Sequence, residues 1–229
     1  MAGKASELGN SDSAAKNSNR EYVGKAALAV SVFAVIWSLF QLYSAASGTF
    51  DAISLRAWHI IFLLTMAFLL YPAWKKKERS TRKYPAVLDV LLILLTVVSF
   101  GYLLINYSNI ALRGGYLLPQ DYIFGAIGIL VIFEAARRVV GNLAVLALVF
   151  LLYNFFGNIA PGDFGHSGFS INRVIDHMFW GSQGIFGIAI GVSATFVFLF
   201  ILFGAFLRIS GFSKFINDLA LTIAGRSPG

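Results

Sequence analysis

The feature that most constrains this chain is an uncharged stretch from Ile185 to Leu207, IFGIAIGVSATFVFLFILFGAFL. At a rise of about 1.5 Å per residue, a helix of this length crosses the hydrocarbon core of a bilayer, which is roughly 30 Å thick. About six such runs occur in the chain, and amphipathic helices that would shield them from water are nearly absent. The sequence therefore predicts an all-α polytopic membrane protein.

Composition supports this class and excludes several others. The chain is 58% hydrophobic and 13% charged, whereas soluble chains have about a quarter of their residues charged. It has no cysteine, which excludes disulfides, thiolate metal sites and cysteine nucleophiles. A net charge of +7 would suggest nucleic acid as the partner of a soluble chain. In a membrane protein the placement of the basic residues matters instead, and we expect no nucleic acid to bind.

We predict about six membrane spans, of which the fourth is the least apolar because it contains Glu134. It reaches the length of a span only by including Pro119–Asp121 at one end and the aliphatic stems of Arg137 and Arg138 at the other. The predicted spans are residues 26–46, 56–74, 86–106, 119–138, 139–157 and 184–208.

The amino-terminal residues 1–25 are small and polar, and they have too little apolar surface to offset the entropy of ordering. We expect a disordered cytoplasmic tail. Ser44–Ala46 resembles a signal-peptide cleavage site, so a cleaved signal is the alternative. The long polar lead before the apolar stretch favours a retained first span.

Basic residues predict the orientation. If the amino terminus is cytoplasmic, fifteen of the eighteen Lys and Arg residues lie inside, including the run KKKERSTRK at 75–83. Arg56, Arg113 and Arg173 are then the residues outside, and we expect ordinary solvated charges there. This asymmetry obeys the positive-inside rule and predicts a multi-pass protein with a cytoplasmic amino terminus.

Two further segments have the pattern of amphipathic helices that lie along a membrane surface. In residues 170–181, apolar side chains recur on one face opposite Arg173, Asp176 and His177. The pattern is repeated from Phe212 to Ile223. We expect the first helix at the outer surface and the second at the cytoplasmic surface.

Ionisable residues within spans are candidates for function, and Asp89, Glu134 and His59 fall in this class. Asp89 follows the basic loop, so pairing with Arg82 or Lys83 is expected. Glu134 precedes Arg137 and Arg138 by three and four residues, the spacing of a helical ion pair. His59 lies at the start of its span, where we expect an interfacial anchor rather than a haem or metal ligand.

Small residues recur on one side of the predicted sixth span. Gly184, Gly187 and Gly191 are followed by Ser193–Thr195, a pattern that lets a neighbouring backbone approach closely. A substrate or ion path is the alternative, although proline and carboxylate are missing beside these glycines. Loop 157–172 is glycine-rich without the lysine of a phosphate-binding loop, so we expect a turn region facing an outer partner.

The sequence contains no HExxH or GxSxG motif and no paired intramembrane carboxylates. Hydrolase chemistry therefore has no residues to carry it, and we expect neither an enzyme nor a cofactor. No catalytic, cofactor-binding or metal-binding residue is assigned, and the substrate-binding residues are not defined by the sequence.

Three stretches resemble a known family. They are RAWHIIFLLTMAFLLYP at 56–72, FEAARRVVGNLAVLALVFLLYNFFGNIAPG at 133–162, and GSQGIFGIAIGVSATFVFLFILFGAFLRISG followed by FINDLALTIAGRSPG to the end of the sequence. They are similar, in this order, to the fused membrane permease of tripartite ATP-independent periplasmic (TRAP) transporters, most closely the type that works with a TAXI-type binding protein.

The resemblance implies that residues 26–138 correspond to the four-helix small subunit and that residues 139–229 begin the large subunit. It also implies sodium-coupled uptake of organic acids, a periplasmic solute-binding protein as partner, and a fixed scaffold that supports a moving domain. In the family the large subunit continues into the hairpins that hold substrate and sodium. We therefore expect the scaffold portion of a permease, which needs the remaining part of the large subunit to transport.

Two other hypotheses about function remain open. A membrane-embedded structural or assembly subunit that transports nothing would also lack a polar intramembrane site. A redox subunit is the third reading, and it requires a bound chromophore.

Overall fold

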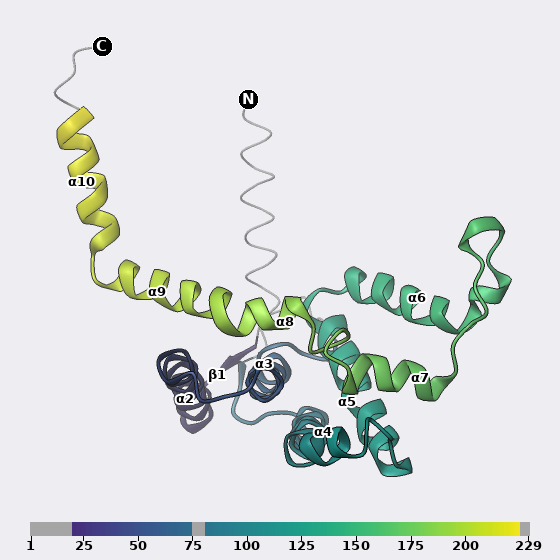
Figure 1. The fold of residues 1–229 in the computed structure, drawn as a ribbon. Coiled ribbons are helices and arrows are strands. Elements are labelled where there is room, and N and C mark those ends of the chain that lie inside the picture. Colours follow the sequence, from purple (N-terminus) through teal and green to yellow (C-terminus); the bar gives the residue numbers. More distant parts are fainter. Residues whose placement is uncertain (1–19, 75–80, 225–229) are drawn as a thin grey trace.

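The computed structural model describes residues 20–74 and 81–224, and this part of the chain is almost entirely helical (Figure 1). Helices satisfy most backbone polar groups within their own segment, as expected for a chain that spans lipid. The main helices are α2 (Lys25–Ser47), α3 (Ala52–Leu70), α4 (Val87–Leu112), α5 (Pro119–Val139), α6 (Asn142–Phe156), α7 (Ile171–Ile175), α8 (Ile188–Val192), α9 (Phe198–Ile209) and α10 (Phe212–Ala224). The short elements are β1 (Glu21–Tyr22), β2 (Thr81–Arg82), the 3-10 turns Gly157–Ile159 and Gly162–Phe164, and the π-helical turns η3 (Asp176–Trp180) and η4 (Ser193–Val197).

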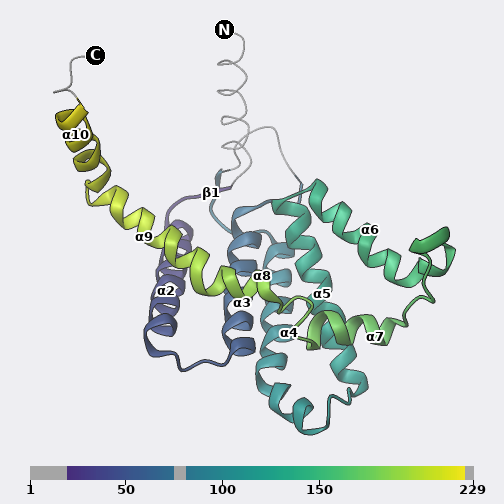
Figure 2. The ribbon, with the colours of Figure 1, turned by 45° about the horizontal axis from the view of Figure 1, so that its top comes forward.

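Helices α2 to α5 lie side by side, and we refer to them as the four-helix unit (Figure 2). Its core lies where α3, α4 and α5 meet, and it includes the fully buried rings of Phe68 and Phe100. Helix α2 packs on the flank of α3 through aromatic side chains, among them Trp37, whose ring stacks on that of Phe62 at 6.1 Å between centroids. The unit is thus held by apolar packing along its length.

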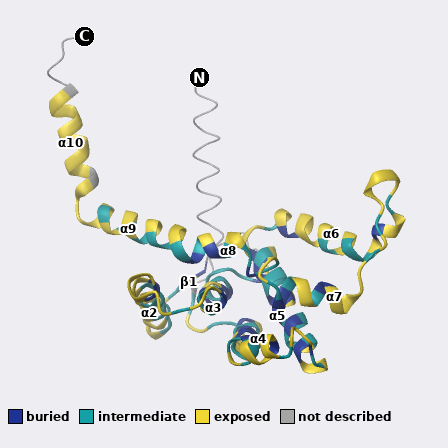
Figure 3. Ribbon diagram, in the orientation of Figure 1, coloured by how far each residue is buried: buried dark blue, intermediate teal, exposed yellow. Residues whose placement is uncertain are grey.

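Apolar side chains also cover the outside of the molecule. Figure 3 shows exposed residues along α2, α6, α9 and α10. Within the described residues, five helices are long and apolar enough to cross a membrane: Lys25–Ser47, Ala52–Leu70, Val87–Leu112, Asn142–Ile159 and Ile188–Ile209. Exposed apolar surface of this extent is expected on a protein whose solvent is lipid, which confirms the predicted all-α polytopic class.

The predicted fourth span forms the continuous helix α5, but it is not among these five helices. Its charged residues, Asp121 near the start and Glu134, Arg137 and Arg138 near the end, account for its lower hydropathy. A crossing by α5 therefore stays a prediction.

Local signals move the predicted ends of other spans. Helix α3 begins at Ala52 because Asp51 caps it, accepting hydrogen bonds from the backbone N–H groups of Ile53 and Ser54 at 3.0 Å. Burial opposes ionisation of Asp51, but hydrogen bonds from Ser54 and Ile53 outweigh it and hold the pKa of the carboxyl below its usual range. The helix ends at Leu70, ahead of Pro72.

The predicted tail, residues 1–25, falls mostly outside the described residues. Its last part, residues 20–25, contains β1, which pairs in parallel with β2, and the first residue of α2. Glu21 lies opposite Thr81 and Tyr22 opposite Arg82 in this pairing. The end of the tail is therefore fixed against the basic loop that follows α3.

The two predicted amphipathic helices are both present, but the first is more deeply packed than expected. It comprises α7 and η3, and Phe179 and Trp180 on its apolar face are buried. These side chains cover α5 where Gly125 and Gly128 leave room, so this part of the face contacts protein rather than lipid. In the second helix, α10, the described side chains on both faces of the helix are exposed.

A substitution of Gly128 by alanine tests this packing. A Cβ atom there would lie 2.0 Å from the ring of Phe179, so we expect the free energy of unfolding to fall by about 1 to 3 kcal/mol. Thermal unfolding in detergent measures the change. In the matched control Gly101→Ala, the new Cβ meets nothing within 4 Å, and the gain in helix propensity keeps stability equal or raises it. Equal melting temperatures for both variants would contradict the packing.

Candidate functional site

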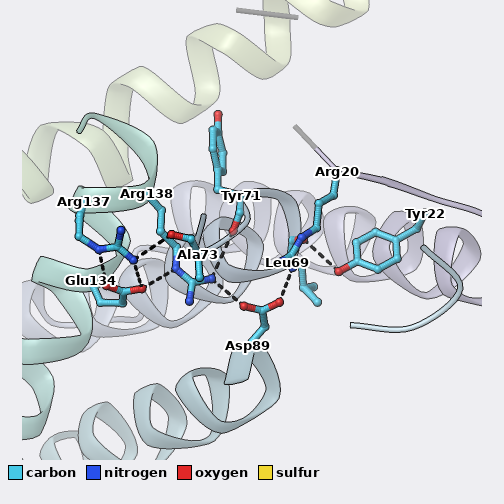
Figure 4. Close-up of polar contacts among 9 residues, drawn as sticks. All are labelled: Arg20, Tyr22, Leu69, Tyr71, Ala73, Asp89, Glu134, Arg137 and Arg138. Carbon is cyan, nitrogen blue, oxygen red and sulfur yellow. Dashed lines mark hydrogen bonds and ion pairs between the residues drawn. The ribbon is translucent and has the colours of Figure 1, made fainter. Parts of the chain in front are cut away.

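Five charged residues, three of them buried, meet at one end of the four-helix unit. We call Arg20, Asp89, Glu134, Arg137 and Arg138 the arginine–carboxylate cluster (Figure 4). Asp89, which is fully buried in the first turn of α4, accepts from Arg20 on one oxygen and from Nη1 of Arg138 on the other at 2.7 Å. Two guanidinium groups thus neutralise one carboxylate that has no access to solvent.

The cluster continues along α5 and satisfies the end of α3. Glu134 accepts from Arg138 Nε at 2.7 Å and from two nitrogens of Arg137, each at 2.8 Å. Arg138 also donates to the carbonyl of Tyr71 at 3.2 Å, and Arg137 to the carbonyl of Ala73 at 3.1 Å. These carbonyls lie just after α3, where the helix no longer supplies backbone donors. The cluster therefore joins α3, α4 and α5 at one end.

The amino-terminal segment closes the same end. Besides its contact with Asp89, Arg20 donates its backbone N–H to the carbonyl of Leu70 at 2.9 Å. The hydroxyl of Tyr22 donates to the carbonyl of Leu69 at 3.0 Å. These contacts join residues from 47 to 69 positions apart in sequence, and Arg20 is 6% exposed.

The structure corrects one of the predicted pairings and confirms another. Asp89 pairs with Arg20 and Arg138 instead of Arg82 or Lys83, because the second arginine of α5 and the end of the tail reach the start of α4. Glu134 pairs with Arg137 and Arg138, as the spacing predicted.

A second buried carboxylate organises the opposite end of the unit. Asp121 is fully buried, and it accepts from the Tyr102 hydroxyl at 2.6 Å, from Arg113 Nη2 at 2.8 Å and from the backbone N–H of Leu118 at 2.7 Å. The indole N–H of Trp180 donates to the backbone carbonyl of Asp121 at 3.2 Å. Arg113, which we expected to be a solvated charge, is instead an ion-pair partner that fixes the turn between α4 and α5.

The continuous stretch α8–η4–α9 crosses over α2 and α3 (Figures 1 and 2). Three side chains of the four-helix unit contact polar groups of this stretch or of the turn just before it, and we call these three the crossing contacts. The Arg56 guanidinium donates to the Phe186 carbonyl, Gln41 donates to the Ala194 carbonyl, and His59 Nε2 lies 3.1 Å from the Ser193 hydroxyl. Two of the three are at η4, where the π-helical turn interrupts the regular helix.

His59 therefore is not the interfacial anchor that we predicted. Its side chain is 1% exposed, and its ring lies between those of Trp37 and Phe198 at centroid distances of 5.6 and 6.0 Å. The sequence places it near the start of α3, but the crossing of η4 covers it.

The glycine pattern is only partly what we expected. Gly191 faces a side chain rather than a backbone, because a Cβ there would lie 2.8 Å from the guanidinium of Arg56. Gly184 and Gly187 precede α8 and lie in a turn, where the atoms that a Cβ would meet are carbonyls of the same turn and of η3. Gly191 therefore leaves room for the Arg56 side chain, and Gly184 and Gly187 allow a tight turn.

Loop 157–172 folds back on itself. The backbone N–H of His166 donates to the Gly157 carbonyl at 3.0 Å, and the His166 ring stacks on that of Phe169 at 5.3 Å. Across residues 20–74 and 81–224, no group of three or more His, Asp or Glu side chains lies close enough to hold a metal ion.

The decisive comparison concerns the second half of the chain. Residues 127–229 match the model of the family described as the tripartite ATP-independent periplasmic transporter, DctM component. The chain is thus similar to a TRAP transporter permease component. The resemblance seen in the sequence is confirmed over this stretch, which we call the DctM-like part. No curated protein and no solved structure matches the chain.

The DctM-like part begins inside α5, ahead of the predicted domain boundary between residues 138 and 139. It includes the α5 members of the arginine–carboxylate cluster, Glu134 to Arg138, and the whole of α8–η4–α9. The crossing contacts therefore join the DctM-like part to helices that precede it in the sequence.

Arg20, Gln41 and Asp121 were missed as structural residues. Asp121 follows Pro119 at the start of a predicted helix, which is a recognisable capping signal. Gln41 is an isolated amide in an apolar helix, a residue type that often bonds another helix in a membrane. Arg20 gave no signal, since nothing local to it indicates a buried partner.

Replacing Asp89 by asparagine tests the cluster. The change leaves Arg20 and Arg138 buried without their shared counter-ion, so we expect the free energy of unfolding to fall by about 3 to 5 kcal/mol. The melting temperature in detergent is the readout. Arg137→Gln is the control, because that side chain is 49% exposed and Glu134 keeps Arg138; its cost stays below about 1 kcal/mol. Equal losses in the two variants would refute the central place of Asp89.

A double-mutant cycle tests the contact between His59 and Ser193. We expect His59→Phe and Ser193→Ala to show a coupling of about 1 kcal/mol in thermal unfolding, the contribution of one buried hydrogen bond. Thr195→Ala is the control partner, because the Thr195 hydroxyl donates to the Gly191 carbonyl of its own helix. If His59→Phe couples as strongly to Thr195→Ala as to Ser193→Ala, the hydrogen bond is not the cause.

Proposed function

We propose that this chain forms the scaffold portion of a TRAP-type permease for sodium-coupled uptake of organic acids. In this proposal a periplasmic solute-binding protein delivers the substrate, and a further part of the large permease subunit carries the substrate and sodium sites. The observation that carries the proposal is the DctM match together with the seating of its helix α8–η4–α9 on the four-helix unit.

The buried polar groups support a fixed rather than a moving role. Asp89 and Asp121 are each held by two or more donors, and each ties together helices at one end of the unit. Each carboxylate already has a guanidinium counter-ion within the protein, so it is not a free negative charge for a coupling ion. The four-helix unit is therefore suited to support a transport domain and not to bind the cargo itself.

The proposed orientation has the amino terminus in the cytoplasm of a bacterium and the protein in the inner membrane. Three segments that the positive-inside rule assigns to the inside meet at one end of the unit: the tail at Arg20, the segment after α3, and the end of α5. Arg113 lies at the opposite end. This grouping supports the proposal, because segments on one side of a membrane must share one end of a helical bundle.

The second candidate is a structural or assembly subunit that transports nothing. The same pairing of Asp89 and Asp121 with arginines of this chain favours it, since among the described residues these carboxylates join helices of the fold. The two candidates differ in whether transport by a complete complex requires this chain.

Reconstitution in proteoliposomes separates them. The chain is inserted together with a co-expressed DctM-type transport segment, the solute-binding protein is added outside, and uptake of labelled organic acids is followed with and without an inward sodium gradient. We expect uptake only with all components and the gradient. Uptake by this chain alone would contradict the scaffold role, and undiminished uptake when the chain is omitted would favour the assembly subunit.

A further inference from the structure

A pocket lies between α6 and the helix formed by α7 and η3, and the described residues that line it include neither of the two buried carboxylates nor any residue of the crossing contacts. Its volume is about 310 Å³, at the lower end of the range of roughly 300 to 1,000 Å³ that is usual for ligand sites. Its lining residues are Asn154, Phe169, Arg173, Val174, His177 and Met178.

The pocket combines a basic edge with an apolar floor. Arg173 and His177 are one helical turn apart on its edge, and the Arg173 guanidinium lies over the Phe169 ring at 5.2 Å from its centroid. Val174 and Met178 form apolar lining, and the described residues that line the pocket include no carboxylate. The nearest acidic residue in sequence, Asp176, is exposed on η3 outside the lining. The pocket is thus suited to a molecule with an anionic head and an apolar body.

The surface of α6 extends the apolar part of the pocket. Together with the 3-10 turn that follows it, this helix is long and apolar enough to cross a membrane, and only 11% of the residues from Asn142 to Ile159 are buried. Val149 and Phe150, which precede Asn154 by about one turn, are 57% and 63% exposed. An acyl chain that leaves the pocket along α6 would therefore stay in contact with apolar side chains.

We propose that this pocket binds an anionic phospholipid, with the phosphate between Arg173 and His177 and an acyl chain along α6. The lipid would fill the space between a spanning helix and an amphipathic helix, a position where headgroup and hydrocarbon meet. The lack of lining carboxylates selects a negative headgroup over a cationic one. The inference stands on the pocket and does not require that the chain takes part in transport.

Native mass spectrometry of the purified chain in detergent, titrated with phosphatidylglycerol or phosphatidylcholine, tests the proposal. We expect tighter binding of phosphatidylglycerol, and a loss of about tenfold in its affinity in the double variant Arg173→Gln/His177→Gln. Arg208→Gln is the matched control, since Arg208 is an exposed arginine at the end of α9 and does not line the pocket. Met178→Trp, which fills the pocket and leaves both basic residues in place, should weaken both lipids.

Any one of four results would overturn the proposal. The first is equal binding of the two lipids, and the second is a loss in Arg208→Gln as large as in the double variant. The third is unchanged lipid binding in the double variant together with lost binding of an acidic protein partner, which would identify the basic edge as a protein contact. The fourth result concerns glycerol phosphate, the headgroup without acyl chains, added as a competitor. If it competes with phosphatidylglycerol at equal concentration, the site recognises free phosphate and not a lipid.

Discussion

The neutralisation of Asp89 is the interaction on which the described architecture depends. A carboxylate in the first turn of a helix, with no exposure to solvent, is stable only if the protein supplies its counter-ions. Here they come from Arg20, ahead of the first long helix, and from Arg138, at the end of the fourth. One buried charge therefore fixes the positions of chain segments that local helix formation leaves independent.

A second constraint acts where α8–η4–α9 crosses the unit. A π-helical turn shifts the regular hydrogen-bond pattern of a helix, and in an apolar environment each exposed carbonyl needs a donor. Gln41 supplies one at Ala194, while His59 pairs with the hydroxyl of Ser193. The polar side chains of α2 and α3 thus meet the polar groups of the interrupted helix. We infer that this crossing attaches the DctM-like part to the four-helix unit.

The sequence predicted what depends on local pattern. The hydropathy runs identified the long helices within four residues, except that α4 ends six residues beyond the predicted span 86–106. The spacing of Glu134 to Arg137 and Arg138 predicted their ion pairs. It did not predict contacts between distant segments. Arg20 and Asp89 are 69 positions apart, and Gln41 and Ala194 are 153 apart, so no periodicity joins them.

His59 illustrates the same failure to predict contacts between distant segments. Its place at the start of an apolar run is typical of an interfacial anchor, and burial came only from a helix that crosses it much later in the chain. The family resemblance implies what periodicity cannot, namely that both parts of the chain belong to one permease, and the family match supports it over residues 127–229. It did not indicate which side chains make the attachment.

The most direct test of the scaffold account is cross-linking of the crossing in the native membrane. The chain has no cysteine, so His59→Cys/Ser193→Cys introduces a single pair, and Ser193→Cys/Leu221→Cys, with its second cysteine on the exposed helix α10, is the control. Mild oxidation followed by peptide mapping reports the disulfide. The account predicts a high yield of the 59–193 link in membranes and little of the control. Absence of that link in protein that elutes as a folded species would contradict the attachment of the DctM-like part to the four-helix unit.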